Sequence, residues 1–227
     1  MTSSETEQNR GRHRLAAVMG DLIGSEQAAS VRVLHEQFNV ALAETSARAK
    51  AIASPLTITL GDEFQGLFYT LTDGMSAVKF MRQRLLANGV PCRFALGIVE
   101  LDSPLNAERA WNMMGAGFAE IREKINDKKS QNAYRFYIPE NNCVEILLEA
   151  VGYSISSVEQ TWTKRQQAVM SLTASGGLNV KELASNLNVT ERNIYKIRTS
   201  SQYDFLMNQW HTIEGVLAQI DTEAQLK

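Results

Sequence analysis

Strand-like and helix-like segments alternate along the first 139 residues, and this order restricts the possible folds more than any other feature of the sequence. Short apolar, β-branched runs predict strands, and apolar residues at helical spacing predict helices. Strands are expected around residues 16–19, 56–60, 64–70, 92–101 and 133–138, and helices around 26–50, 73–88 and 106–125. The resulting order, β-α-β-β-α-β with one more helix and strand, predicts an α+β domain of the ferredoxin-like type at residues 14–140.

The character of the sequence changes after Pro139, where strand-like runs stop. Residues 141–160 are expected to form a connecting helix, and residues 161–227 an all-α domain that contains a helix-turn-helix. The polar residues 1–13 are expected to form a disordered tail.

Composition excludes several classes of protein. The net charge of −2 gives no overall attraction to nucleic acid, so such an affinity would have to be local. Two cysteines are too few for a disulfide framework or a zinc cluster. No apolar run approaches the ~20 residues that span a bilayer, and the start lacks the apolar segment of a secretory signal. We therefore expect a cytoplasmic protein with no membrane partner.

Three carboxylates are expected to meet at one end of the predicted sheet. Asp21 follows the first strand, and Asp62 and Glu63 form the tight turn between the second and third strands. In a ferredoxin-like sheet the first strand pairs antiparallel with the third, so these side chains would lie close together and repel one another. Magnesium suits such a place because it binds through one or two carboxylates and completes its shell with waters and phosphates. Asp62 is the first choice as ligand, and Glu63 the second.

A purely structural interpretation of the same residues stays open. Turns with the sequence Gly-Asp are common, and Asp21 can simply favour the start of the following helix, for which Ser25 is a plausible N-cap. An acid at a helix start contributes about 0.3–1 kcal/mol without any metal.

Several segments resemble the bacterial SatD family: AVMGDLIGS, TITLGDEFQGL, RFALGI, AYRFY and TWTKRQ, in this order between about Leu15 and Tyr203. More distantly, GDLIGS and GDEF resemble the two metal-binding motifs of class III nucleotide cyclases and diguanylate cyclases. That resemblance implies a nucleoside triphosphate held by Mg²⁺ or Mn²⁺ on Asp21 and Asp62. It also implies that the backbone of Ile23, Gly24 and Ser25 faces phosphate, which a helix N-terminus there would favour.

The chain also departs from the cyclase pattern. Ile58 stands where class III adenylyl cyclases tend to carry a purine-reading lysine. Asn106 and Arg109 are loose counterparts of the asparagine and arginine that steady the transition state in those enzymes. Their spacing would place them on one face of a helix, and the alternative is an ordinary solvated helix start.

The stretch from Asn179 to Ser201 has the pattern of a helix-turn-helix. Apolar residues occupy the packing positions, Asn188 stands at the turn, and Thr190 is placed to cap the second helix. Six basic and two acidic residues between 161 and 200 give a local charge of +4, which is typical of a DNA-binding module. The candidate DNA-binding residues are Lys164, Arg165, Arg192, Asn193, Lys196 and Arg198.

Three hypotheses follow from these patterns. The first is a DNA-binding regulator whose cyclase-like domain binds a divalent metal, a nucleotide or both; because operators are usually read by dimers, it predicts a homodimer on double-stranded DNA. The second is a Mg²⁺- or Mn²⁺-dependent cyclase-type enzyme. The third is a scaffold with a degenerate site, in which the helical region is a docking or dimerisation element.

Overall fold

The computed structural model describes residues 13–27, 30–174 and 178–224. A mixed sheet forms its centre and contains β1 (Arg14–Leu22), β2 (Ile52–Leu60), β3 (Glu63–Phe68), β4 (Cys92–Leu101), β5 (Gly115–Ala116) and β6 (Tyr134–Tyr137). Residues 1–12 of the predicted N-terminal tail lie outside the described residues.

The strand order is β2-β3-β1-β4, with β5 and β6 both paired to β4. The pairs along this path are antiparallel, whereas β6 runs parallel to β4. The central position of β1, between β3 and β4, is the arrangement that the β-α-β-β-α-β order predicts. The fold is therefore α+β, with a mixed six-stranded sheet.

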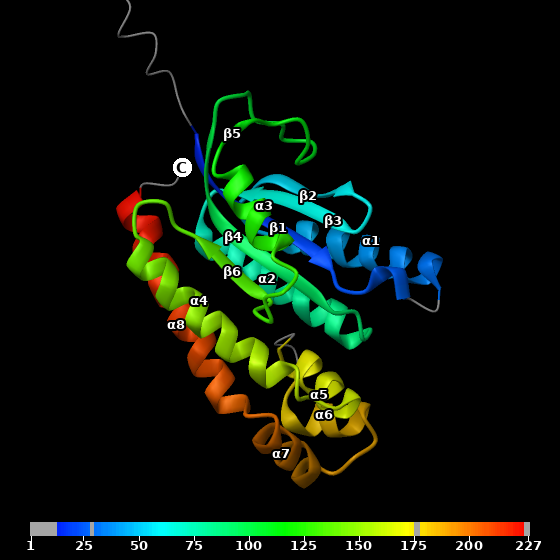
Figure 1. Cartoon of the computed structure of the whole chain (residues 1–227). Coiled ribbons are helices and arrows are strands. Elements are labelled where there is room, and N and C mark those ends of the chain that lie inside the picture. Colours follow the sequence, from blue (N-terminus) through cyan, green and yellow to red (C-terminus); the bar gives the residue numbers. More distant parts are fainter. Residues whose placement is uncertain (1–12, 28–29, 175–177, 225–227) are drawn as a thin grey trace, which may run out of the picture.

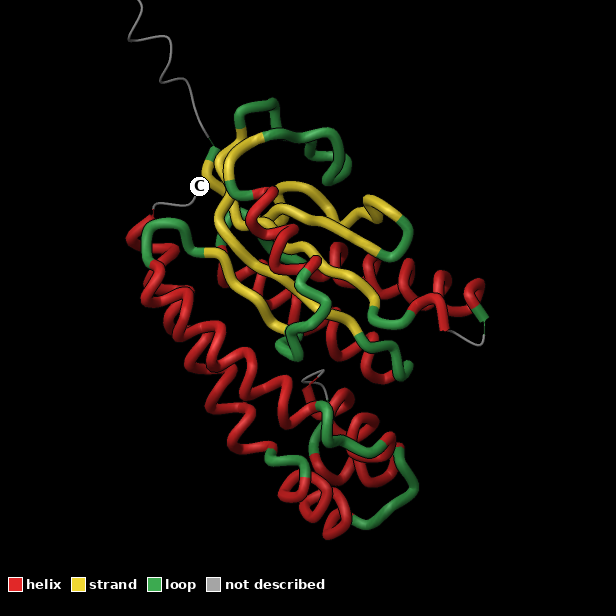
Figure 2. The backbone as a smooth tube through the Cα atoms, viewed as in Figure 1, coloured by secondary structure: helices red, strands yellow, loops and turns green. Residues whose placement is uncertain are grey.

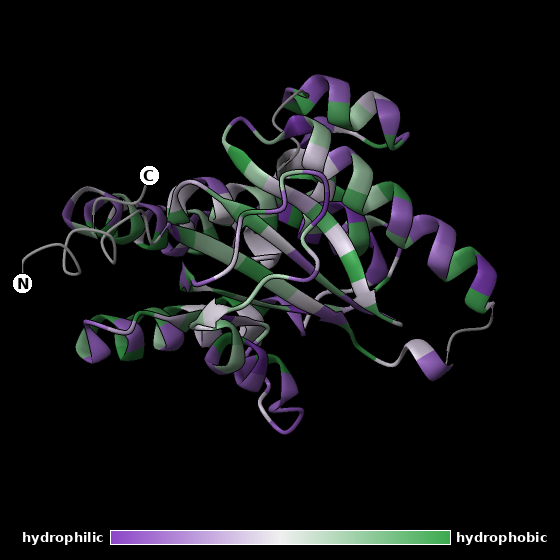
Figure 3. Ribbon diagram, turned by 90° about the horizontal axis from the view of Figure 1, so that it is seen from above, coloured by the Kyte–Doolittle hydropathy of each residue, from purple (hydrophilic) through white to green (hydrophobic). Residues whose placement is uncertain are grey.

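Helices cover both faces of the sheet (Figure 1). The helices α1 (Val31–Arg48) and α2 (Leu71–Ala87) lie on one face and share a core with Val18, Phe64 and Phe94. On the other face, α3 (Phe118–Asn126) packs on alternate strand residues such as Ala17 and Leu67. Since successive strand residues point to opposite faces, the continuous apolar sequence of β1 is explained by burial on both. Figure 3 shows the hydrophobic residues concentrated on the strands and the polar ones along the outer parts of the helices.

Two predicted helix starts were wrong by a few residues. The N-cap of α1 is Ser30, whereas Ser25 begins a separate 3₁₀ turn, η1 (Ser25–Gln27). The N-cap of α2 is Thr70, whose hydroxyl accepts a hydrogen bond from the backbone N–H of Asp73. Asp73, at which the helix was expected to start, lies inside the first turn, where its charge suits the helix dipole.

The helix predicted at residues 106–125 was wrong over its first half. Residues 102–114 form an irregular loop, and α3 begins only at Phe118 after the short strand β5. Asn106 explains part of this: its Oδ1 accepts the backbone N–H groups of Glu108 and Arg109. Such a local bond offers the backbone an alternative to the helix.

The C-terminal region is helical and lies against the sheet layer (Figure 2). It contains α4 (Asn142–Glu159), α5 (Lys164–Ala174), α6 (Val180–Asn186), α7 (Glu191–Ser200) and α8 (Tyr203–Ala224). The two long helices, α4 and α8, lie side by side and antiparallel, and α8 also contacts α2. Near the end of α8, the carboxylate of Asp221 accepts the backbone N–H groups of Leu71 and Thr72 at 2.7 and 3.0 Å. An acid from α8 therefore caps the start of α2.

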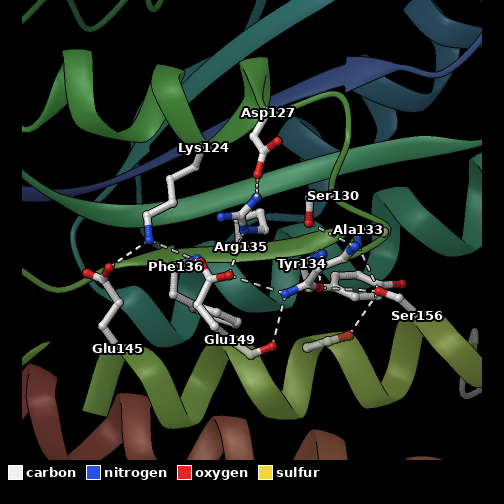
Figure 4. A network of polar contacts seen from close by, with 12 residues as sticks. Lys124, Asp127, Ser130, Ala133, Tyr134, Arg135, Phe136, Glu145, Glu149 and Ser156 are labelled. Carbon is white, nitrogen blue, oxygen red and sulfur yellow. Dashed lines mark hydrogen bonds and ion pairs between the residues drawn. The ribbon is translucent and has the colours of Figure 1, made fainter. Parts of the chain in front are cut away.

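Carboxylates of α4 bind the outer edge of β6 (Figure 4). Glu149 accepts the backbone N–H of Phe136 at 2.9 Å, and Glu145 accepts that of Ile138 at 2.7 Å. Both acids also pair with cations from the sheet layer, since Lys124 reaches both and Arg135 Nε lies 2.6 Å from Glu149. These side chains satisfy donors that an edge strand would otherwise present to other chains.

Within the described ranges, none of the helices combines the length and hydropathy needed to cross a lipid bilayer.

Candidate functional site

The structure brings Asp21 and the Asp62–Glu63 turn together at one rim of the sheet. Asp21, near the end of β1, pairs in register with Glu63 at the start of β3. The backbone N–H of Leu22 donates to the carbonyl of Asp62 at 3.4 Å. The predicted meeting of acids that are some forty residues apart in sequence therefore follows from the β1–β3 pairing. We call this group the acidic rim: Asp21, Asp62 and Glu63.

Asp21 is the buried member of the acidic rim, with only 3% of its surface exposed. Burial raises the pKa of its carboxyl, and the neighbouring charge of Asp62 raises it further. Two cations oppose this effect: Lys128 Nζ lies 4.0 Å and Arg93 Nε 3.6 Å from Asp21 Oδ2. Burial and the charge of Asp62 therefore make the Asp21 carboxylate costly to ionise, and Lys128 and Arg93 reduce this cost only in part.

The other predicted rim residues are more accessible. Asp62 and Glu63 are half-buried, and Asp62 accepts a hydrogen bond from the hydroxyl of Ser25. Ile23 and Gly24 are exposed, and Gly24 has a positive φ of 70°. The segment from Ile23 to Ser25 lines an open groove of about 620 Å³ together with α1 and residues 88–91. The loop proposed to face phosphate therefore borders both the acidic rim and a groove.

The donor set of the rim fits an ion that needs few protein ligands. Among the described residues, no three His, Cys, Asp or Glu side chains are grouped so that they could hold a metal. Asp21 and Asp62 supply two carboxylates, which is the number that Mg²⁺ uses when substrate phosphates complete its shell. Arg93 already neutralises part of the charge of Asp21. The rim thus suits a metal that arrives with a phosphate ligand better than a metal alone.

The structure does not bring Asn106 and Arg109 to this rim. Ser54 donates to the carbonyl of Asn106, and Ser54 lies toward the end of β2 that is remote from the Glu63–Leu60 pair. Asn106 holds its own loop, because its side chain also donates to the carbonyl of Trp111. The backbone N–H of Arg109 is bound in the same loop, and its side chain is exposed. Asn106 and the backbone of Arg109 therefore take part in hydrogen bonds of their own loop, and neither residue lies at the acidic rim.

A second candidate site lies on the helices α6 and α7. These helices are joined by a short turn and pack with α5 around a small core of their own. Asn188 adopts the left-handed conformation at the turn, with φ of 51°. The hydroxyl of Thr190 accepts the N–H of Asn193 and caps α7. The turn and the cap are therefore formed by the residues that the sequence pattern predicted. The apolar core consists of Val169, Leu183, Ala184, Ile194 and Ile197, with Leu172, Leu178, Val180, Leu187 and Val189 around it.

With both sites described, the chain can be compared with known proteins. The sequence profile of the SatD family matches residues 15–213. The chain belongs to the SatD family. No curated protein gave a significant match to this SatD protein. Among solved structures, a bacterial light-regulated adenylyl cyclase is similar, with a TM-score of 0.41 and 12% sequence identity. The match covers 55% of the SatD chain and 42% of the cyclase chain, so the SatD chain spans less than half of that protein.

The basic residues proposed for DNA binding in this SatD protein differ in exposure. Arg192 and Lys196 are exposed on α7, and Lys164 and Arg165 are exposed at the start of α5. Asn193 is half-buried. Arg198 is half-buried as well, with its guanidinium 5.0 Å from the centre of the Tyr203 ring. Arg198 therefore stabilises the junction of α7 with α8 and is less free to reach a ligand than Arg192 or Lys196.

Two residues of interest in the SatD protein were not predicted. Tyr195 is 56% exposed on α7, in the chain next to Lys196 and one turn beyond Arg192. Its helical spacing from Arg192 could have identified it. Arg93 pairs in register with Asp21, and its Nε and Nη1 atoms are buried without a hydrogen-bond acceptor. Only the register of β1 with β4 identifies Arg93 as a neighbour of Asp21, and local sequence does not determine that register.

Proposed function

We propose that this SatD family protein is a DNA-binding regulator whose sheet domain carries a site for a divalent metal with a nucleotide. DNA binding is supported mainly by α7. This helix is capped by Thr190, packs on a small apolar core with α5 and α6, and exposes Arg192, Tyr195 and Lys196. Arginine suits the acceptor edges of bases in the major groove, and lysine suits phosphate. The local excess of positive charge around these helices supports the same interpretation.

Lys196→Ala and Arg192→Ala are each expected to lower the affinity for duplex DNA. They should also make that affinity less dependent on the salt concentration. Each phosphate contact contributes about 0.9 to the slope of log affinity against log salt, so losing one contact should lower the slope by about that amount. Fluorescence anisotropy of a labelled duplex of mixed sequence, measured at several salt concentrations, checks both effects. Arg32→Ala on α1, where the side chain is 86% exposed, is the matched control and should leave the slope unchanged. Salt-independent retention of DNA by the wild-type protein would contradict the proposal.

The acidic rim supports the second half of the proposal. Asp21 and Asp62 would hold Mg²⁺ or Mn²⁺, with Glu63 as the further candidate, and the bound ion would supply positive charge to phosphate oxygens. The loop of Ile23, Gly24 and Ser25 would bind phosphate beside Asp62, to which Ser25 is hydrogen-bonded; the backbone N–H of Ile23 donates to the carbonyl of Pro91 at 2.9 Å and would have to exchange that partner. The groove along α1 offers space for the rest of a nucleotide. Arg93, whose buried nitrogens lack acceptors, would add a positive charge at the phosphate end.

Asp62→Asn is expected to weaken the binding of Mg²⁺–ATP or Mg²⁺–GTP by about tenfold or more, because one charged ligand to the ion is lost. Isothermal titration calorimetry of each nucleotide into the wild-type protein and the variant measures the change. Asp204→Asn, at an exposed position on α8, is the matched control and should bind as the wild type does. If neither nucleotide gives a heat of binding with the wild-type protein, the proposed metal and nucleotide site is rejected and the scaffold hypothesis remains.

The same rim also supports an alternative activity. If the bound nucleotide is turned over, the protein is a Mg²⁺- or Mn²⁺-dependent cyclase-type enzyme rather than a sensor. Product formation that is lost in Asp62→Asn distinguishes the enzyme from the regulator. As a regulator, the SatD protein should bind paired half-sites as a homodimer, because operators are usually palindromic.

A further inference from the structure

The outer side of the helix pair α4 and α8 is apolar and uncharged. The two helices lie side by side along one edge of the molecule (Figure 1). Over the whole length of α4, which the structure describes without a gap, no exposed residue carries a charge. The exposed residues after Asn142 are Cys143, Ile146, Leu147, Ala150, Tyr153 and Ser157. Their helical spacing places them on one face, and Ile146, Leu147 and Tyr153 are each more than half exposed.

The charged residues of α4 all point to the opposite side. Glu145 and Glu149 bind the edge of β6, and Glu159 pairs with Arg82 of α2. A surface helix ordinarily turns its charged residues to water and its apolar ones to the core. In α4 the acids face the protein, and large apolar side chains face outward. An exposed apolar surface of this kind indicates contact with another molecule.

The helix α8 continues this surface across an open groove of about 400 Å³. Val144, Leu147 and Val151 of α4 line the groove with Gln209, Thr212 and Val216 of α8. From Phe205 to Thr222, a stretch that is described throughout, no exposed residue of α8 is an acid, a lysine or an arginine. We call this surface the helix-pair face. It consists of the six exposed α4 residues named above, with Phe205, Gln209, Thr212 and Val216 of α8.

We propose that the helix-pair face binds the same face of a second copy of this chain. Two copies related by a two-fold axis would form a four-helix bundle from α4 and α8 of each. In such a contact each residue near the axis meets its own copy, so a charged residue there would meet a like charge. A face without charge is therefore what self-association requires. The interface gives a place to the homodimer of the regulator, and it rests on the proposed function only for its biological use.

The size of the helix-pair face suits a dimer. The 18 residues of α4 are about 27 Å long, and two helices that are each about 10 Å wide give about 540 Å² in projection. The accessible surface is larger than this projection, because side chains and the groove make the face uneven. Dimer interfaces bury about 800 Å² per partner, and weak ones about 600 Å². One face of this area therefore supplies most or all of what a dimer needs.

Two other occupants fit the helix-pair face less well. Residues 1–12 contain no apolar residue besides Met1, so they lack the side chains that would cover it. An anionic membrane is bound by apolar helix faces that are flanked by lysine and arginine. Neither α4 nor α8 contains either residue. A second copy supplies the apolar groups and brings no like charges to the face.

Sedimentation velocity of the full-length protein over a range of concentrations tests the dimer. The wild-type protein should reach twice the chain mass of 25.3 kDa. Leu147→Glu should raise the dissociation constant of the dimer at least tenfold, because it removes a carboxylate from water without a partner. Leu60→Glu is the matched control, since Leu60 is exposed at the end of β2 and outside the face. The control should dimerise as the wild type does.

Thiol alkylation tests where the two copies meet. The chain has two cysteines, of which Cys92 is buried and Cys143 exposed, so Cys143→Ser leaves one buried thiol. In this background, a further Ala150→Cys substitution should make a thiol that reacts with iodoacetamide at least tenfold more slowly in the dimer than in the monomer. Ala47→Cys, at an exposed position of α1, is the matched control and should react equally in both.

The possible results separate the interface from the proposed function. A monomeric wild-type protein, an unchanged dissociation constant in Leu147→Glu, or equal alkylation of Ala150→Cys in monomer and dimer would each overturn the interface. Circular dichroism identifies a variant that does not fold, and the alkylation rates then decide alone. Lys196→Ala should leave the dissociation constant of the dimer unchanged. A dimer that meets through this face but does not bind DNA would contradict the regulator and leave the interface standing.

Discussion

The Glu159→Gln variant is expected to unfold with a free energy about 3–5 kcal/mol lower than that of the wild-type protein. Glutamine has nearly the same shape as glutamate but no charge. It would leave the guanidinium of Arg82 buried without a counter-ion, since Nε and Nη2 both bind Glu159 Oε2. The loss is large because the pair is almost completely removed from water. Equilibrium unfolding in urea, with the slope of the transition compared between variants, measures it.

A second ion pair of the same chain provides the control. Arg84 and Glu44 lie 2.5 Å apart at the surface, with side chains 46% and 40% exposed. Glu44→Gln is expected to change the stability by at most about 1 kcal/mol. The double variant Arg82→Met/Glu159→Gln removes the buried charge and should recover part of the loss. An equal, small effect of Glu44→Gln and Glu159→Gln would show that Arg82 is neutralised by something other than Glu159.

The same substitution at two helical glycines should have opposite effects. A Cβ atom at Gly152 of α4 would stand 2.4 Å from the carbonyl oxygen of Tyr134, because the helix packs directly on β6. Gly152→Ala is therefore expected to lower the stability by about 1–3 kcal/mol. At Gly215 of α8 a Cβ would meet nothing within 4 Å, and the residue is exposed. Gly215→Ala should raise the stability by about 0.5–1 kcal/mol, since glycine is a poor helix former.

Thermal unfolding of the two glycine variants under one set of conditions measures this difference. The two variants gain the same methyl group and the same helix propensity, so their difference reports the contact with β6 alone. A stabilised Gly152→Ala would mean that α4 can move away from the strand without loss, which is incompatible with its bonds to Phe136 and Ile138.

The strand order of the sheet could be predicted from the sequence because few connections between strands are allowed. The strands have clear apolar runs, and a β-α-β-β-α-β order leaves one antiparallel arrangement with β1 at the centre. The meeting of Asp21 with the Asp62–Glu63 turn follows from that order alone. The second strand was expected only at residues 56–60, after Pro55, yet β2 begins at Ile52 and continues through this proline. This is possible because β2 is an edge strand with shifts of register on both sides of Pro55.

The surroundings of the acids could not be predicted in the same way. Arg93 reaches Asp21 through the pairing of β1 with β4, and Lys128 reaches it from the loop after α3. Such contacts depend on register and loop conformation, for which local sequence carries little information. The 102–114 loop gives the same lesson. Ala110 is buried and its backbone N–H donates to the hydroxyl of Thr57 at 3.1 Å, whereas Trp111 and Met114 of the same loop are exposed.

The position of α8 was also left open by its pattern. An apolar face with Trp210 and Ile213 predicts packing on the helix-turn-helix module or pairing with a second subunit, and neither of these is a contact with the sheet layer. The structure shows this face in the core that includes α2, with Trp210 edge-on to Tyr134 at 4.9 Å. Periodicity identifies which face of a helix is buried, but the partner is determined by the rest of the fold.

The bonds from Glu145 and Glu149 to β6 have a consequence for how this chain is made on the ribosome. Synthesis completes β6 at Tyr137, before α4, which supplies the two acids, has been translated. Until α4 folds back, a nascent chain would expose the N–H groups of Phe136 and Ile138 to any extended peptide nearby. A fragment that ends at Pro139 should therefore associate through this edge, whereas the full-length chain occupies it with its own side chains.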